Sequence, residues 1–261
     1  MDTEYTIADL AVNMHNLDKR IVHFSVIDST NRFLLEENDL SGGTVVWADY
    51  QTAGRGRFNR AWQSPPGDAL LFSILLREPY CAISLSVYPL LAAVGVYDGL
   101  RSVLPEGNVL SVKWPNDILL NGKKVCGILA QSRMKGARCE SLVVGVGLNV
   151  NQPKDFFQEN LKNASSIFLE TGCQWDRFEI LQRVLLAIDH LLTELSVSGR
   201  RVIMEKWSDA CDSVGQMIAI HDGNETVSGI FHGVASDGAM RLETGSGVRT
   251  FYAGDVSVVK E

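Results

Sequence analysis

The dipeptide Asn121-Gly122 stands between two apolar runs, and it constrains the fold of this chain more than any other feature. A two-residue hairpin turn needs positive φ at both central positions, which asparagine and glycine tolerate. The pair therefore predicts a tight β-hairpin, and the surrounding stretch 109–132 predicts two or three short strands. The chain must contain a sheet with antiparallel pairing.

The rest of the chain mixes strand and helix patterns. Apolar and β-branched runs predict strands over 43–52, 69–77 and 141–151, while apolar spacing predicts amphipathic helices over 87–104 and 177–195. Residues 26–31 read as a strand end entering a helix, with Ser29 or Thr30 as its N-cap. After Trp207, about four short strands are separated by glycine turns. We predict an α+β domain over 1–206 and a small β-barrel over 207–261.

Composition excludes several classes of protein. Hydrophobic residues make up 46% of the 261 residues and charged residues 21%, which is ordinary for a globular protein. The net charge of −7 argues against a surface that coats nucleic acid. No apolar run reaches the roughly 18 residues needed to span a bilayer, and the N-terminus lacks the basic start of a signal peptide. Five scattered cysteines suggest neither a disulfide framework nor a zinc site, so we expect a cytoplasmic protein.

The segment GRGRFNRAW (54–62) places three arginines in six residues of an otherwise acidic protein. Its glycines allow close approach of a ligand to the backbone, and guanidinium groups suit phosphate and carboxylate oxygens. The indole of Trp62 could cover a flat ring. Asn59 stands where a dinucleotide fingerprint needs its third glycine, and no P-loop ending occurs. We favour an anion-binding loop, preceded by Gln51, over a solvated basic turn.

The segment KWPND (113–117) is a second candidate, together with the lysines that follow the predicted turn. Pro, Asn and Asp are all turn-forming residues, but a turn does not account for the lysines. By strand alternation, Lys124 should share a face with Cys126 and Ile128, while Lys123 faces solvent. A third candidate is GVGLNVN (145–151), whose glycines indicate close packing, a ligand or an ordinary bulge.

Several catalytic signatures are missing from the sequence. The five histidines form no H-E-x-x-H pair, and there is no G-x-S-x-G elbow. Without a base-activated nucleophile, the residues favour catalysis by positioning and electrostatics, as in transfer at phosphorus.

Taken together, these segments resemble those of biotin–protein ligases in order and spacing. The segments are STN (29–31), QTAGRGR (51–57) with Trp62, KWPND (113–117) with Lys124 and Gly127, and GLNVN (147–151). The similarity extends over about residues 20–261. It implies a catalytic domain of the class II aminoacyl-tRNA synthetase-like, biotinyl/lipoyl ligase type, a mixed β-sheet with helices, followed by an SH3-like β-barrel.

The resemblance also implies a reaction and its residues. Biotin and ATP would form biotinyl-5′-AMP with Mg²⁺, and a lysine of a biotin carboxyl carrier protein would then accept the biotin. Biotin would be bound by Ser29, Thr30, Asn31, Gln51, Gly54, Arg55, Arg57, Lys124 and Gly127. The nucleotide would be bound by Arg57, Trp62, Asn116 and Asn149, with Trp62 stacked on adenine. Lys124, Arg57 and Arg55 would be catalytic, and Asp117 is a candidate Mg²⁺ ligand.

Other readings stay open at this point. Some of these ligases carry an N-terminal helix-turn-helix and act as repressors, but only about twenty residues precede the pattern here, so we expect no DNA binding. A lipoate–protein ligase would share the catalytic fold, and a binding module could capture biotin or a nucleotide without catalysis. We expect no membrane partner, and a monomer or a homodimer.

Overall fold

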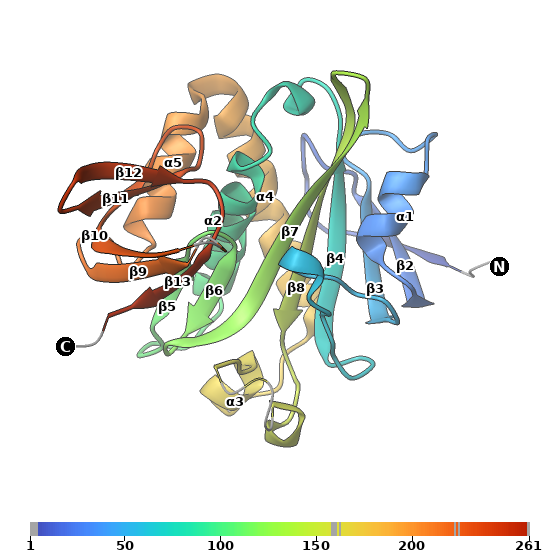
Figure 1. Ribbon diagram of the computed structural model, residues 1–261. Coiled ribbons are helices and arrows are strands. Elements are labelled where there is room, and N and C mark those ends of the chain that lie inside the picture. Colours follow the sequence, from blue (N-terminus) through green and yellow to red (C-terminus); the bar gives the residue numbers. More distant parts are fainter. Residues whose placement is uncertain (1–4, 158–160, 162, 222, 224, 260–261) are drawn as a thin grey trace.

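The computed structural model describes residues 5–157, 161, 163–221, 223 and 225–259. Its larger part contains an eight-stranded sheet in the order β1-β2-β3-β4-β8-β7-β6-β5 (Figure 1). β2 and β3 run parallel, and the other described neighbours are antiparallel. The strands are β1 (Thr6–Asp9), β2 (Arg20–Ile27), β3 (Val45–Gln51), β4 (Ala69–Leu76), β5 (Leu110–Lys113), β6 (Asp117–Leu120), β7 (Lys123–Lys135) and β8 (Arg138–Asn149). The predicted mixed sheet with helices is confirmed.

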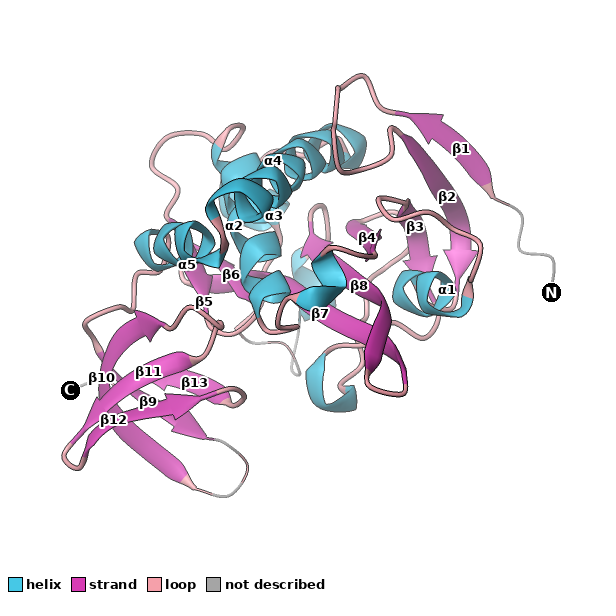
Figure 2. Ribbon diagram, turned by 90° about the horizontal axis from the view of Figure 1, so that it is seen from above, coloured by secondary structure: helices cyan, strands magenta, loops and turns pink. Residues whose placement is uncertain are grey.

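Helices cover both faces of this sheet (Figure 2). On one face lie α2 (Val87–Arg101), α4 (Arg177–Ser198) and α5 (Arg200–Asp209), and on the other lies α1 (Thr30–Glu36). The shorter elements are η1 (Arg57–Asn59), η2 (Tyr80–Ala82), η3 (Lys154–Phe157) and α3 (Ile167–Thr171). Side chains alternate between the two cores: in β4, Ile74 packs in the core under α2 and Leu75 in the core under α1. None of the described helices is both long and apolar enough to cross a membrane.

Helices α2 and α4 approach closely because glycine leaves room at their crossing. A Cβ on Gly95 would lie 2.4 Å from Ile188 Cγ1, and one on Gly99 would lie 2.9 Å from Val184 Cγ2. Both are shorter than a van der Waals contact, so this crossing depends on the missing side chains. The closely packed helix pair covers one face of the sheet.

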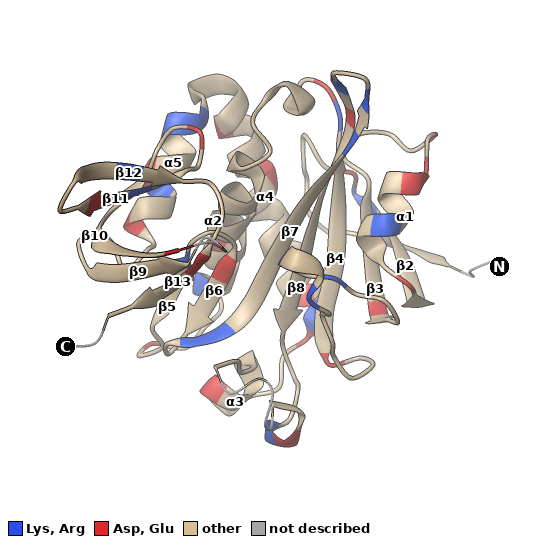
Figure 3. Cartoon of the chain, in the orientation of Figure 1, with Lys and Arg blue, Asp and Glu red and all other residues tan. Residues whose placement is uncertain are grey.

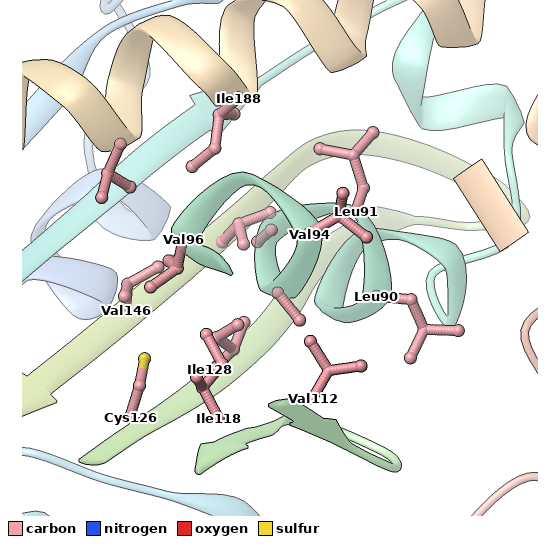
Figure 4. Packing of buried hydrophobic residues seen from close by; sticks show 14 of the residues in the cluster. Leu90, Leu91, Val94, Val96, Val112, Ile118, Cys126, Ile128, Val146 and Ile188 are labelled. Atoms are coloured by element: carbon pink, nitrogen blue, oxygen red, sulfur yellow. The ribbon is translucent and has the colours of Figure 1, made fainter. Parts of the chain in front are cut away.

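The predicted hairpin turn is confirmed, with positive φ at Asn121 (51°) and Gly122 (78°). The strands beside it contain an irregularity that the sequence did not reveal. Leu119 pairs with Lys124 and Ile118 with Cys126, so β7 has one extra residue at this point, a β-bulge. Strict alternation therefore fails, and the expectation that Lys124 shares a face with Cys126 is wrong. Cys126 points into the core beneath α2 (Figure 4), while Lys124 lies on the face that carries α1.

The C-terminal part is a curved five-stranded antiparallel sheet in the order β12-β11-β10-β9-β13. Its strands are β9 (Met217–His221), β10 (Thr226–Val234), β11 (Met240–Thr244), β12 (Gly247–Phe251) and β13 (Asp255–Val258). It has one more strand than the four expected, because Tyr252–Gly254 turns the chain back to pair β13 with β9. The expected boundary at 207 falls inside α5, where buried Trp207 packs against Phe231 of β10 with ring centroids 6.3 Å apart.

Candidate functional site

A buried polar cluster lies where the N-terminus of α1 meets the sheet. Ser29 caps the helix, its hydroxyl accepting from the backbone N–H of Arg32 at 3.4 Å. Gln51 Oε1, at the end of β3, accepts from the backbone N–H of Thr30 at 2.8 Å. The Thr30 hydroxyl lies 2.6 Å from that of Ser73, which is fully buried in β4. The structure thus brings three predicted biotin residues together around Ser73, which sequence reasoning missed although it is the one polar residue of an apolar strand.

Asn31 completes this cluster from the second position of α1. Its Oδ1 accepts from Ser73 Oγ at 2.6 Å, and its Nδ2 donates to Gln131 Oε1 at 2.9 Å. The amide reaches the sheet because the residue beneath it is Gly145, where a Cβ would lie only 2.0 Å from Asn31 Oδ1. In the candidate segment GVGLNVN (145–151), the first glycine therefore allows the Asn31 side chain to lie close to the sheet.

The arginine-containing segment 54–62, called the arch below, lies over the same face of the sheet. The backbone N–H of Trp62 donates to Gly54 O at 2.9 Å, and that of Gly56 donates to Arg60 O at 2.7 Å. Phe58 at the tip has positive φ (54°), which is uncommon for a bulky residue. Gly54 is required by packing, since a Cβ there would lie 2.8 Å from Trp62 O. The arch is a defined structure held by its own backbone bonds.

Trp62 lies flat against two glycines that face each other across β7 and β8. Gly127 pairs with Gly147, and a Cβ on them would lie 2.9 Å and 2.5 Å from ring atoms of Trp62. The indole N–H is buried and has no hydrogen-bond partner among the described residues. Such a group is costly to leave unpaired, so a polar acceptor at this position would be favourable.

Lys124 lies beside Trp62, with its Nζ 6.0 Å from the indole centroid. The same ammonium forms an ion pair with Asp117 Oδ1 at 2.6 Å, at the start of β6. The side chain of Lys124 is 34% exposed, so an approaching anion can reach it. The basic start of β7 is visible in Figure 3.

Arg57 connects the arch to the KWPND turn. Its Nη1 donates to Asn116 Oδ1 and to the backbone oxygen of Gly254, both at 3.4 Å. Asn116 is fixed in turn, because its Nδ2 donates to Ile128 O at 2.7 Å. Burial lowers the pKa of Arg57, but guanidinium groups stay charged at neutral pH. Arg57 contacts Asn116, and Lys124 contacts the adjacent Asp117, so the two cations converge from segments far apart in sequence.

Three other predicted residues lie differently. Arg55 is exposed and forms no ion pair with another described residue. Asn149 is buried. Its side chain donates to Ser165 O at 2.9 Å and accepts from Gln152 Nε2 at 2.9 Å, so it connects the end of β8 to other segments of the protein. Within the described ranges, no group of three or more His, Cys, Asp or Glu could hold a metal ion, and Asp117 as a Mg²⁺ ligand stays a prediction.

Residues 23–149 match the Biotin/lipoate A/B protein ligase family, and residues 214–259 match the Biotin protein ligase C terminal domain. The chain is 34% identical over 245 residues to the bifunctional ligase/repressor BirA of Bacillus spizizenii, covering 93% of this chain and 75% of that protein. It is 32% identical over 232 residues to the biotin–[acetyl-CoA-carboxylase] ligase of Paracoccus denitrificans, with 88% and 96% covered. The Aquifex aeolicus biotin protein ligase, solved with biotin and ATP, superposes with a TM-score of 0.79 at 30% identity, with 92% and 99% covered.

Proposed function

The chain belongs to the biotin protein ligase family and is a ligase, and we propose that it biotinylates one lysine of a biotin carboxyl carrier protein in two steps. In the first, a biotin carboxylate oxygen attacks the α-phosphorus of ATP, and pyrophosphate leaves. In the second, the ε-amine of the acceptor lysine attacks the acyl carbon of biotinyl-5′-AMP. An amide forms, AMP leaves and the amine loses a proton.

The convergence of Arg57 and Lys124 is the observation that carries this proposal. The first step brings a carboxylate to a phosphate, and two unit charges 4 Å apart repel by about 4 kcal/mol at an effective dielectric of 20. Two fixed cations around the meeting point offset this repulsion and stabilise charge that develops on the phosphate oxygens. We assign Lys124 to oxygens shared by the carboxylate and the α-phosphate, and Arg57 to the phosphates.

The remaining roles follow from position on the sheet. The cluster of Thr30, Asn31 and Gln51 offers donors and acceptors suited to the ureido ring of biotin, and Ser73 joins it. Trp62 is assigned to adenine, and its indole N–H, which has no hydrogen-bond partner in the described part of the chain, lies beside the site. Mg²⁺ would enter with ATP as part of the substrate. A single carboxylate fits this, because Mg²⁺ keeps several waters and takes few protein ligands beside phosphate oxygens.

Mass spectrometry of a carrier domain tests the proposal directly. After incubation with this protein, biotin and MgATP, we expect the carrier to gain one biotinyl group on one lysine. Lys124→Ala should greatly slow the gain, while Lys206→Ala, which removes a lysine paired with Glu194 between α4 and α5, should leave its rate unchanged. An unmodified carrier, or full activity in Lys124→Ala, would overturn the assignment. Pyrophosphate exchange supported by lipoate in place of biotin would identify a lipoate ligase instead.

We further propose that the protein acts in the cytoplasm without DNA, as a monomer or homodimer. The net charge of −7 opposes phosphate binding outside the site, and free cysteines suit a reducing compartment. A gel shift with a biotin operator should show no specific retardation, and a retarded band would refute this part.

A further inference from the structure

The backbone of Lys124 is held by a segment that does not belong to the sheet. Its N–H donates to Asn163 O at 2.8 Å, and its carbonyl accepts from the N–H of Ser165 at 2.9 Å. The β7–β8 ladder starts at Cys126, so the segment 163–165 takes the place of β8 beside Lys124. Asn149, the last residue of β8, fastens this segment by donating to Ser165 O at 2.9 Å.

A buried carboxylate fixes the outer side of this arrangement. Glu170 of α3 has a side chain that is only 8% exposed. Its Oε1 accepts from the Ser165 hydroxyl at 2.5 Å and from Lys123 Nζ at 2.9 Å, and its Oε2 from Asn121 Nδ2 at 3.4 Å. Burial alone would raise the pKa of Glu170, but the hydrogen bonds from Ser165 and Lys123 outweigh it and hold the pKa below its ordinary value. Glu170 therefore stays charged and connects the turn, the strand and the added segment.

Two lysines that are adjacent in sequence therefore form ion pairs with two different carboxylates. Lys123 pairs with Glu170 outside the site, and Lys124 pairs with Asp117 inside it. The bulge makes a fixed register necessary here, because a slip of one residue would turn Lys123 toward the site and Lys124 away from it. We propose that Glu170 is a positioning residue that sets the register of β7 at its start and so keeps the Lys124 ammonium in the site. This inference rests on the proposed role of Lys124.

Single-turnover formation of biotinyl-adenylate by the full chain tests it. At saturating biotin and MgATP, Glu170→Gln should slow the step by about tenfold, because misplacing a catalytic group by a fraction of an ångström is enough for such a loss. The KM for biotin should rise no more than it does in Lys124→Met, since Glu170 reaches the biotin site only through Lys124 and does not contact the Thr30 and Asn31 cluster. Glu194→Gln is the matched control, because it removes another glutamate–lysine pair, with N–O 2.6 Å, away from the site. It should leave the rate unchanged.

The decisive measurement is the same substitution in a Lys124→Met background. If Glu170 acts through Lys124, the double variant should be no slower than Lys124→Met alone. An equal loss in both backgrounds, or a wild-type rate in Glu170→Gln, would overturn the inference. Should Glu170→Gln fail to fold, Ser165→Ala removes only the hydroxyl contact and should slow the step to a smaller extent. Failure of the proposed function is distinguishable, because the wild-type chain would then form no biotinyl-adenylate.

Discussion

Two glycines of β8 lie under different parts of the site, so replacing each with alanine should impair one part and spare the other. A Cβ on Gly145 would lie 2.0 Å from Asn31 Oδ1, and one on Gly147 would lie 2.5 Å from Trp62 Cε2. The two distances are 1.4 Å and 0.9 Å below the 3.4 Å at which ordinary contact begins. The methyl group cannot be accommodated without moving the side chain above it. Gly145→Ala should therefore disturb Asn31, and Gly147→Ala should disturb Trp62.

The size of each effect follows from what must move. Overpacking of a filled site costs about 1–3 kcal/mol of unfolding free energy. Asn31 cannot turn away without losing its bonds to Ser73 (2.6 Å) and Gln131 (2.9 Å), each with a net value of about 0.5–1.5 kcal/mol. If the displaced Asn31 weakens biotin binding by the value of one such bond, about 1.4 kcal/mol, the KM for biotin rises tenfold. The indole of Trp62 has no hydrogen bond to lose among the described residues, so its displacement acts through packing alone.

Initial rates of pyrophosphate exchange and urea denaturation measure the two quantities. We expect Gly145→Ala to raise mainly the KM for biotin and Gly147→Ala mainly the KM for ATP. Gly245→Ala is the control, because a Cβ there meets nothing within 4 Å and φ lies outside the left-handed region. The reasoning is refuted if both site variants keep wild-type stability and KM values, or if Gly147→Ala raises the KM for biotin alone.

Three further predictions concern charge and titration. Asp255→Asn removes the exposed ion pair with Arg60 (N–O 2.5 Å), so the unfolding free energy should fall by only about 0.2–1 kcal/mol. This difference should vanish in about 1 M salt, and its persistence in urea titrations would contradict a screened contact. Alkylation near pH 8 should modify exposed Cys173 well before Cys126, because burial raises the pKa of the Cys126 thiol; peptide mass mapping would reveal the reverse order. Because the pKa of Glu170 is lowered from 4.5, its stabilisation is complete above that pH and is lost as pH falls through the folded value. Glu170→Gln should flatten the acid limb of the stability curve, and an unchanged limb would refute this.

Local features of the structure could be read from the sequence. Positive φ at Asn121 and Gly122 follows from the conformational freedom of those two residue types alone. The helices over Val87–Arg101 and Arg177–Ser198 follow from apolar spacing, and Ser29 caps α1 as one of the two expected residues. Each of these depends on interactions within a few residues, which is why sequence patterns predict them.

Contacts between distant segments could not be read in the same way. Alternation placed Lys124 on the wrong face because the bulge depends on pairing with Leu119 and on the segment 163–165. Ser73 stands among apolar neighbours, and nothing local shows that its hydroxyl meets Thr30, 43 residues earlier. The contact of Arg57 with Gly254 spans 197 residues and joins two domains. Motifs indicated the candidate residues, but not how the fold holds them.

The partners of Arg57 and Arg60 show why only one of these two arginines is available to a phosphate. Arg60 meets the carboxylate of Asp255, which cancels its charge, and the Arg60 hydrogen bond lowers the pKa of Asp255. Among the described residues, Arg57 donates hydrogen bonds to neutral acceptors, the Asn116 amide and the Gly254 carbonyl, both at 3.4 Å, while Asp255 and Asp117 act on its charge without a direct ion pair. A half-buried cation that forms no direct ion pair with a described residue is poorly solvated, so a phosphate gains more by approaching Arg57 than by approaching Arg60. The C-terminal part of the chain, which supplies Asp255 and Gly254, thereby determines which of these two arginines is left for the substrate.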